Sequence, residues 1–237
     1  LQTTVFEAEK RLMQRSASKE IANFVKSYHE KMGVEFKLNT RADQIEPSDK
    51  DVSIRLKDGN CANPDFVVIG VGVQAESSIA EDAGIGCSNG ILVDENCLTD
   101  DKNVYAAGDC VNYYFSRYGT RRRLESVQNA IDQAAIVSSS IIGEPTVYSS
   151  IPWFWSDQYD LKLKIAGLSQ DSDLIVSRGN ADDFKFSVCH FKDNKLNAVE
   201  CVNDQKTFML GKKLIEAQSN ITPEAIKNTQ TNLKDWL

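Results

Sequence analysis

A chain of 237 residues, of which 41% are hydrophobic, is long enough to bury one large core or two modest ones. Its net charge of −7 and its pI of about 5.0 argue against nucleic acid or a membrane surface as a partner. The six cysteines are scattered without a Cys-x-x-Cys pair, which argues against a bound metal and indicates free thiols in a reducing cytoplasm.

The first predicted element is a strand, Thr3–Phe6, that ends in the acid Glu7. In a Rossmann unit, such an acid accepts hydrogen bonds from the adenosine ribose, and the Gly-x-Gly-x-x-Gly fingerprint lies about 20 residues earlier. Only six residues precede Glu7, so we expect the C-terminal part of a longer protein. Glu7 is a candidate NAD-binding residue that would repel the 2′-phosphate of NADPH, although Lys10 and Arg11 could reach that phosphate. A solvated strand end is the alternative.

Further elements of a nucleotide-binding domain are predicted up to about residue 70. Hydrophobic spacing and turn residues predict a helix from Ser18 to Gly33 and strands at 34–38 and 52–56, the last followed by a hairpin turn. The unbroken apolar run at 66–69 predicts a strand that is buried on both faces. It ends at Gly70-Val71-Gly72, and Gly72 is a second candidate NAD-binding residue.

The most informative stretch is an apolar strand predicted at 104–107, after another at 91–93, that ends in Gly108 and Asp109. Glycine at the end of a buried strand lets a ligand's phosphate or sugar approach the backbone. The carboxylate of Asp109 can accept hydrogen bonds from a polyol. A solvent-facing cap is the alternative for Asp109.

A helix is predicted from Ser126 to Ile142, with Ser126, Val127 and Gln128 at its start. Free N–H groups and the positive end of the helix dipole suit an electron-rich ring there. Together with the Gly-Asp turn, this helix suggests a flavin site, and a ligand-free core helix is the alternative. The face expected to be buried consists of small and aliphatic residues: Val127, Ala130, Ile131, Ala134, Ser138, Ile141 and Ile142.

The hydrophobic pattern changes in the last part of the chain. Alternating apolar residues predict an antiparallel sheet with one solvent-facing side, with strands at 161–165, 174–176, 184–188 and 196–202. A helix is predicted at about 206–217, and residues 221–237 are expected to form a looser tail.

Three motifs carry a resemblance to a known family: Tyr-Ala-Ala-Gly-Asp-Cys at 105–110, Glu-Ser-Val-Gln-Asn-Ala at 125–130 and Pro-Trp-Phe-Trp-Ser-Asp-Gln at 152–158. In this order they resemble the FAD-dependent NADH:ferredoxin reductases, a family that includes the putidaredoxin and rubredoxin reductases, over about residues 4–203. The resemblance implies an α/β fold. Partial NAD-binding (1–70) and FAD-binding (71–150) Rossmann-type domains would precede a smaller α+β C-terminal domain (151–237) with an antiparallel sheet.

The same resemblance implies an oxidoreductase that passes electrons from NADH through FAD to a small iron–sulfur (ferredoxin) or rubredoxin-type carrier, without a catalytic side chain. It implies FAD-binding roles for six residues: Gly108, Asp109, Ser126, Val127, Gln128 and Trp155. The indole of Trp155 would pack beside the isoalloxazine, while Trp153 tends toward the surface. A hydrophobic anchor between domains is the alternative for Trp155.

The chain departs from the family pattern in several places. Gln128 stands where proline is frequent, and the loop after Gly72 lacks the usual Arg-Pro-Asn. The basic residues Arg117, Arg121, Arg122 and Arg123 would either dock an acidic ferredoxin or lie in a solvated loop. Residues 125–161 hold five acids and no Lys or Arg, and this surface would repel such a ferredoxin.

Because both dinucleotide fingerprints are missing, we expect this chain alone to retain little FAD and to be inactive. An alternative from another class is a non-catalytic remnant whose C-terminal sheet serves as an oligomerisation or partner-binding module. A homo-oligomer is compatible with either interpretation.

Overall fold

The computed structural model describes residues 1–47 and 52–237. The chain divides into two compact units, Leu1–Gly72 and Val73–Leu237. Within the described residues, no helix is both long enough and apolar enough to cross a bilayer. All six cysteines are free thiols.

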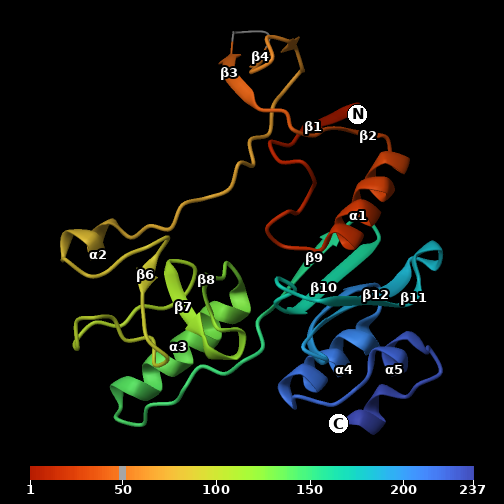
Figure 1. Cartoon of the computed structure of the whole chain (residues 1–237). Helices are drawn as coiled ribbons and strands as arrows, with labels where there is room; N and C mark the ends of the chain where they lie inside the picture. Colours follow the sequence, from red (N-terminus) through yellow and green to blue (C-terminus); the bar gives the residue numbers. More distant parts are fainter. Residues whose placement is uncertain (48–51) are drawn as a thin grey trace. The chain divides into compact units, whose positions relative to one another are not determined.

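The first unit is built on a parallel pair of strands, β1 (Thr3–Phe6) and β2 (Val34–Lys37), connected through α1 (Lys19–Lys31) (Figure 1). Ser18 caps α1 by accepting a hydrogen bond of 3.3 Å from the amide of Ile21. Gly33 has a φ of +89°, which lets the chain leave the helix and turn into β2. This strand–helix–strand connection is the building block of a Rossmann domain. The predicted helix and the strand at 34–38 are confirmed.

A three-stranded antiparallel sheet follows, formed by β3 (Ala42–Pro47), β4 (Val52–Leu56) and β5 (Cys61–Ala62). It confirms the predicted strand at 52–56. The strand predicted at 66–69 is wrong: this segment pairs with no strand among the described residues, and Phe66 is 61% exposed. A strand buried on both faces needs paired neighbours and a covering layer on each face, and an apolar composition supplies neither.

The second unit begins with α2 (Ser78–Asp82) and a small mixed sheet. Strand β6 (Ile91–Leu92) runs parallel to β7 (Val111–Phe115), and β7 forms a hairpin with β8 (Thr120–Arg123) through a 3₁₀ turn at Ser116–Tyr118. The helix α3 (Val127–Ile141) follows and confirms the predicted helix. In the shared core, the rings of Tyr113, Phe115 and Tyr148 meet edge to face, with centroids 5.0–5.9 Å apart.

The segment at 104–107 is not a regular strand. Tyr105 forms a single bridge with Leu98, and the Ala106 amide donates to the carbonyl of Cys97 at 3.1 Å. The prediction of a strand is therefore wrong. Apolar residues form a regular strand only beside a neighbour of matching length, and here the segment has only the short stretch at 97–99.

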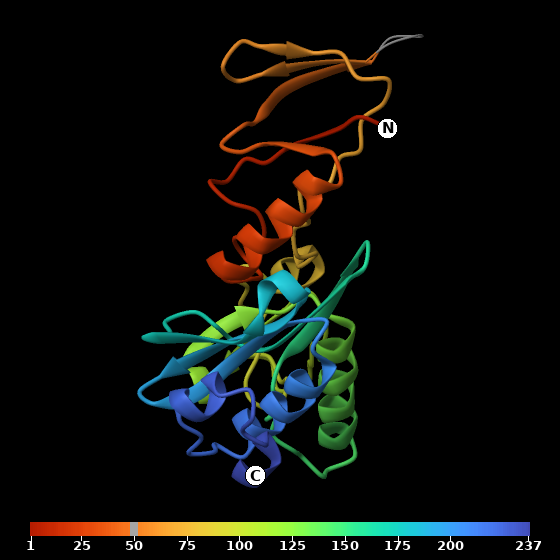
Figure 2. The same cartoon turned by 90° about the vertical axis from the view of Figure 1, so that its right-hand side faces the viewer.

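The rest of the second unit is a five-stranded antiparallel sheet with the order β11-β12-β13-β10-β9. Its strands are β9 (Trp153–Gln158), β10 (Leu161–Gly167), β11 (Leu174–Asn180), β12 (Lys185–Lys192) and β13 (Lys195–Val202), with a 3₁₀ turn at Ala181–Asp183. The helices α4 (Gln205–Glu216) and α5 (Pro223–Lys227) pack on one face of this sheet (Figure 1, Figure 2). The predicted strands and the helix at 206–217 are confirmed.

Two predictions for this domain are wrong. The C-terminal tail is not loose, because it forms α5 and a 3₁₀ turn at Leu233–Trp236, and its residues Ile221 and Ile226 belong to the buried core. Strands β12 and β13 do not alternate between core and solvent, since they are buried over nearly their whole length. Their polar residues do not mark a wet face: Nε2 of His190 and Oε2 of Glu200 lie 3.1 Å apart in a fully buried pair.

Candidate cofactor-binding site

The turn that carries Gly108 lies against the start of α3. Gly108 is buried with a φ of +90°, a conformation that glycine adopts without strain. A Cβ at this position would lie 3.7 Å from the Cβ of Ala130. The Gly108 amide donates a hydrogen bond of 2.8 Å to Oε1 of Gln133. The Gly-Asp turn and the helix therefore meet, although the β7–β8 hairpin separates them in the sequence.

Asp109 follows in this turn and is exposed. Its backbone carbonyl accepts a hydrogen bond of 3.0 Å from Nη1 of Arg123, which fixes the main chain. Among the residues that the structure describes, no hydrogen bond or ion pair to the Asp109 carboxylate is present. A carboxylate on a fixed backbone, without a protein partner, is suited to accept hydrogen bonds from a polyol.

The start of α3 presents backbone N–H groups. Ser126 is the N-cap, and its hydroxyl oxygen accepts a hydrogen bond of 3.2 Å from the amide of Asn129. The amides of Val127 and Gln128 have no acceptor within the helix. The Gln128 side chain donates to Asp132 (2.6 Å) along the helix, and Val127 is 60% exposed. These N–H groups are placed to meet an anionic or electron-rich ligand.

The buried face of α3 is not the predicted one. Val127, Ile131 and Ile141 are each more than half exposed, whereas Asn129 and Gln133 are the buried residues of the helix. A hydrophobic stripe marks the buried face only when the opposing surface is apolar. At Asn129 and Gln133 the opposing surface presents polar groups, which these amides satisfy, and the apolar contacts of the helix come from Ile136 and Val137.

Asn129 bridges two neighbouring segments. Its Nδ2 donates to the Leu124 carbonyl, and its Oδ1 accepts from the Tyr148 hydroxyl, both at 3.1 Å. The Tyr148 carbonyl accepts from the hydroxyl of Tyr113 at 3.0 Å. Burial raises the pKa of both tyrosine hydroxyls well above the ordinary value, so both stay protonated donors. The sequence analysis missed these residues. Two amides at positions i and i+4 of a helix were the available signal.

Trp155 lies in β9, a strand that contacts α3. Its side chain is 45% exposed, and Lys164 stands directly opposite in β10. Trp153 packs on the core with its ring centroid 5.6 Å from that of Phe208. The expectation that Trp153 tends toward the surface is therefore wrong, because Trp153 faces α4 and is the anchoring residue of the pair. The Trp155 indole contacts the Trp153 ring, with centroids 5.6 Å apart, and its exposed part remains accessible to another ring.

The basic cluster at 117–123 belongs to the β7–β8 hairpin. Arg117 donates to the Ile215 carbonyl at the end of α4 (2.9 Å), and Arg121 donates to two carbonyls of the neighbouring segments (3.0 Å each). Arg123 binds the Asp109 carbonyl as described above. Three of the four arginines donate to backbone carbonyls, so the segment is a hydrogen-bonded hairpin rather than a solvated loop, although Arg117 and Arg121 remain exposed.

In the first unit, Glu7 directly follows β1, and its Oε1 accepts a hydrogen bond of 2.8 Å from the amide of Glu9. The guanidinium of Arg11 donates to four carbonyls of residues 12–17 at 2.9–3.3 Å. The Arg11 guanidinium is therefore held by hydrogen bonds to its own loop. Gly72 has a φ of +87°, and a Cβ there would lie 3.8 Å from Nη1 of Arg15. No contact between Glu7 and Gly72 is present among the described residues.

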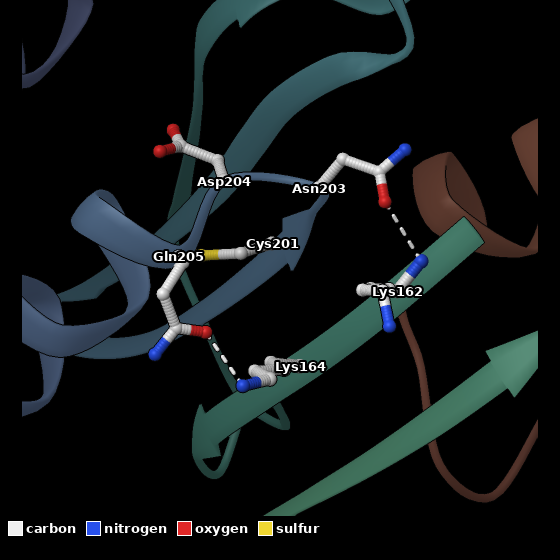
Figure 3. Close-up of a pocket in the computed structure, with 6 residues that line it drawn as sticks. All are labelled: Lys162, Lys164, Cys201, Asn203, Asp204 and Gln205. Carbon is white, nitrogen blue, oxygen red and sulfur yellow. Dashed lines mark hydrogen bonds between the residues drawn. The ribbon is translucent and has the colours of Figure 1, made fainter. Parts of the chain in front are cut away.

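A small pocket of about 190 Å³ lies between β10 and the start of α4 (Figure 3). Asn203 accepts from the Lys162 amide (2.8 Å), and Gln205 accepts from Nζ of Lys164 (2.5 Å). Asp204 caps α4 by accepting from the Thr207 amide (3.1 Å). The polar groups of this pocket hold the domain together, and none of the predicted site residues lines it.

Comparison with known proteins agrees with this geometry. The model of the pyridine nucleotide-disulphide oxidoreductase family matches residues 1–134, and the reductase C-terminal model matches residues 153–237. The chain belongs to the pyridine nucleotide-disulphide oxidoreductase family. This result confirms the resemblance to the reductases and the predicted α/β fold with an antiparallel C-terminal domain.

Particular relatives are ferredoxin-type reductases. The chain is 37% identical to rhodocoxin reductase of Rhodococcus erythropolis over 99% of its own length and 55% of the relative's. The ferredoxin reductase of the CYP199A2 system from Rhodopseudomonas palustris superposes with a TM-score of 0.94, at 37% identity, over 99% of this chain and 58% of that one. The covalent putidaredoxin reductase–putidaredoxin complex gives a TM-score of 0.93 at 29% identity, with 99% and 57% covered. The chain thus spans little more than half of these relatives.

Proposed function

We propose that this chain is part of an FAD-dependent oxidoreductase that passes electrons from NADH to a small iron–sulfur or rubredoxin-type carrier. One observation carries the proposal: the Gly108–Asp109 turn is held against the start of α3, and none of the described residues pairs with the Asp109 carboxylate. Relatives named for rhodocoxin, putidaredoxin and rubredoxin support the class of acceptor.

The residues of this site fit the groups of FAD. Gly108 lets a ligand approach the backbone, and the Asp109 carboxylate would accept from ribityl hydroxyls for about 1–3 kcal/mol. The first-turn amides at Val127 and Gln128, oriented by the Ser126 cap, would stabilise negative charge on a ring edge by about 0.5–2 kcal/mol. When bound, FAD accepts hydride and releases electrons one at a time.

Trp155 is the residue that we propose beside the ring system. Its indole is exposed on the strand next to α3, whereas Trp153 already supplies the contact with the core. The Trp155 indole at this position would exclude water from one face of the isoalloxazine ring. It would also mark the side from which electrons leave the cofactor.

The first unit supplies the nucleotide side of the proposal. Glu7 at the end of β1 would accept from the adenosine ribose, and Gly72 would allow close approach of the loop to the nucleotide. Because Arg11 is occupied by its own loop, it offers little compensation to a 2′-phosphate. We therefore propose NADH as the donor.

The proposed domain organisation follows these roles. Residues 1–70 would be the remainder of an NAD-binding domain, 71–150 a second part of the FAD-binding domain, and 151–237 the C-terminal reductase domain. The free cysteines favour a cytoplasmic location.

Flavin retention tests the proposal. In the complete, flavin-loaded enzyme, Asp109→Ala should weaken FAD retention at least about fivefold, the equivalent of ~1 kcal/mol. Cys110→Ala is the matched control, since the neighbouring thiol donates to the Ala107 carbonyl at 3.7 Å and packs against the apolar core. Equal FAD content per protein in the two variants, measured by absorbance, would contradict the assignment.

A second candidate function is a partner-binding or oligomerisation module without catalysis. The outer strand β11 favours it, because Leu174 and Ile175 are about two-fifths exposed on an open sheet edge (41% and 43%). The visible spectrum of the purified complete protein separates the two functions: a flavoprotein is yellow, and a protein without the cofactor is colourless.

A further inference from the structure

Two buried amide side chains, Asn129 and Gln133, form a polar seam on the inner face of α3. Asn129 and Gln133 are one helical turn apart, and each is at most 2% exposed. Burying an amide side chain stabilises a fold little compared with an apolar residue of the same volume, and it is costly unless the amide is hydrogen-bonded. Helix α3 nevertheless places amides here and leaves its aliphatic residues Val127 and Ile131 in the open.

The hydrogen bonds of the seam divide between two partners. Asn129 ties the helix to the neighbouring Leu124 and to Tyr148, and through Tyr148 to strand β7. Gln133 reaches elsewhere: its Oε1 accepts the Gly108 amide at 2.8 Å, in a site that is closed to solvent. Within the described residues, this is the one hydrogen bond between α3 and the Gly108–Cys110 turn.

The Gly108 amide has a special need for this acceptor. With a φ of +90° it lies in a turn rather than a paired strand, so no ladder partner is available to it. Ala130 approaches the same turn from the helix, to 3.7 Å from an ideal Cβ at Gly108. Gln133 thus connects the turn to the helix by a direct hydrogen bond, beside the contact with Ala130.

We propose that Gln133 is a positioning residue that couples the Asp109 carboxylate to the first-turn amides of α3. The inference rests on the proposed flavin function. The ribityl chain and the ring belong to one covalent molecule, so their two protein contacts act together only when the separation between turn and helix is fixed. The Gln133 amide fixes that separation without touching the cofactor.

Three variants of the complete, flavin-loaded enzyme test the coupling between the Gly108–Cys110 turn and α3. Gln133→Met keeps the length of the side chain and removes the acceptor. Gln133→Glu keeps an oxygen acceptor, and a protonated carboxyl still accepts through its carbonyl oxygen. Ser138→Ala is the matched control, because it removes a side-chain hydrogen bond of the same helix, from the Ser138 hydroxyl to the Ala134 carbonyl at 2.8 Å, away from the proposed site.

Two measurements are made on each variant: amide hydrogen exchange across residues 104–110, and the dissociation constant for FAD together with the visible circular dichroism of the bound flavin. We expect Gln133→Met to speed exchange at 104–110 and to weaken FAD binding by about tenfold or more with an altered flavin signal. Gln133→Glu should recover much of the slow exchange and of the FAD affinity at pH 6, and Ser138→Ala should change neither exchange at 104–110 nor the flavin signal.

Faster exchange in Gln133→Met with unchanged FAD affinity and flavin signal would overturn the positioning role and leave only a structural one. Unchanged exchange would overturn the coupling itself. A complete wild-type enzyme that binds no FAD, with exchange still faster in Gln133→Met, would refute the flavin function while leaving the coupling between turn and helix in place.

Discussion

Replacing Gly211 with alanine should destabilise the second unit, although alanine is the better helix former. Gly211 is buried in α4, which packs on β13. A Cβ on Gly211 would lie 2.8 Å and 2.9 Å from the two methyl groups of Val199 and 3.3 Å from its Cβ. Real Cβ contacts are close to 3.4–4 Å, so the helix or the strand has to move.

The size of the destabilisation depends on whether the Val199 side chain or the α4 backbone can move away. Val199 is fully buried, and its β-branched side chain has methyl groups at both contact points, so no rotation relieves the clash. Its strand is held on both edges by β12 and β10. Overpacking of this kind costs about 1–3 kcal/mol, whereas replacing glycine in a helix gains about 0.5–1 kcal/mol. We expect a net loss of about 1–2 kcal/mol.

Urea unfolding followed by tryptophan fluorescence measures this loss. All three tryptophans, Trp153, Trp155 and Trp236, lie in the second unit, so the signal reports on that unit alone. The control is a double-mutant cycle with Val199→Ala, which removes the clashing methyl groups at its own cost. In that background, Gly211→Ala should become neutral or stabilising. A stabilising effect of Gly211→Ala in the wild-type background, or strict additivity in the cycle, would refute the reasoning.

The remaining predictions concern nucleotide choice and the C-terminal tail. The complete enzyme should prefer NADH by at least about tenfold in kcat/KM, since ~1.4 kcal/mol of repulsion between Glu7 and a 2′-phosphate suffices, and Glu7→Ala should narrow the ratio mainly by improving NADPH. Comparable efficiency with both nucleotides in the wild type would remove Glu7 from the site. Arg178 donates to the carbonyls of residues 226, 228, 229 and 231 at 2.6–3.1 Å, so Arg178→Lys should speed hydrogen exchange at 226–231 and cost about 1–3 kcal/mol. Exchange rates in Arg178→Lys equal to those of the wild type would show that the positive charge at position 178 is sufficient to hold residues 226–231, without the guanidinium hydrogen bonds.

Local chemistry in the sequence was enough to predict much of this molecule. The Ser18 and Ser126 caps, with the apolar spacing that follows each, located α1 and α3 because capping and helical periodicity act within one or two turns. The positions of the C-terminal strands were also predicted correctly, although β12 and β13 are buried on both faces and do not alternate between core and solvent. The three motifs around Gly108, Ser126 and Trp155 identified the family, because such short motifs carry the chemistry of a site more directly than the fold does.

Which residues of a strand or helix are buried depends on the surface that packs against that element, and only the tertiary structure decided this. Residues 66–69 are as apolar as a buried strand, but burial needs partners that composition does not provide. The aliphatic face of α3 is exposed and its amides are buried, because the surface opposite presents the Gly108 amide and other polar groups of distant segments. Which side chain meets which backbone group depends on how segments far apart in the chain come together, and for that reason Gln133 emerged only from the folded structure.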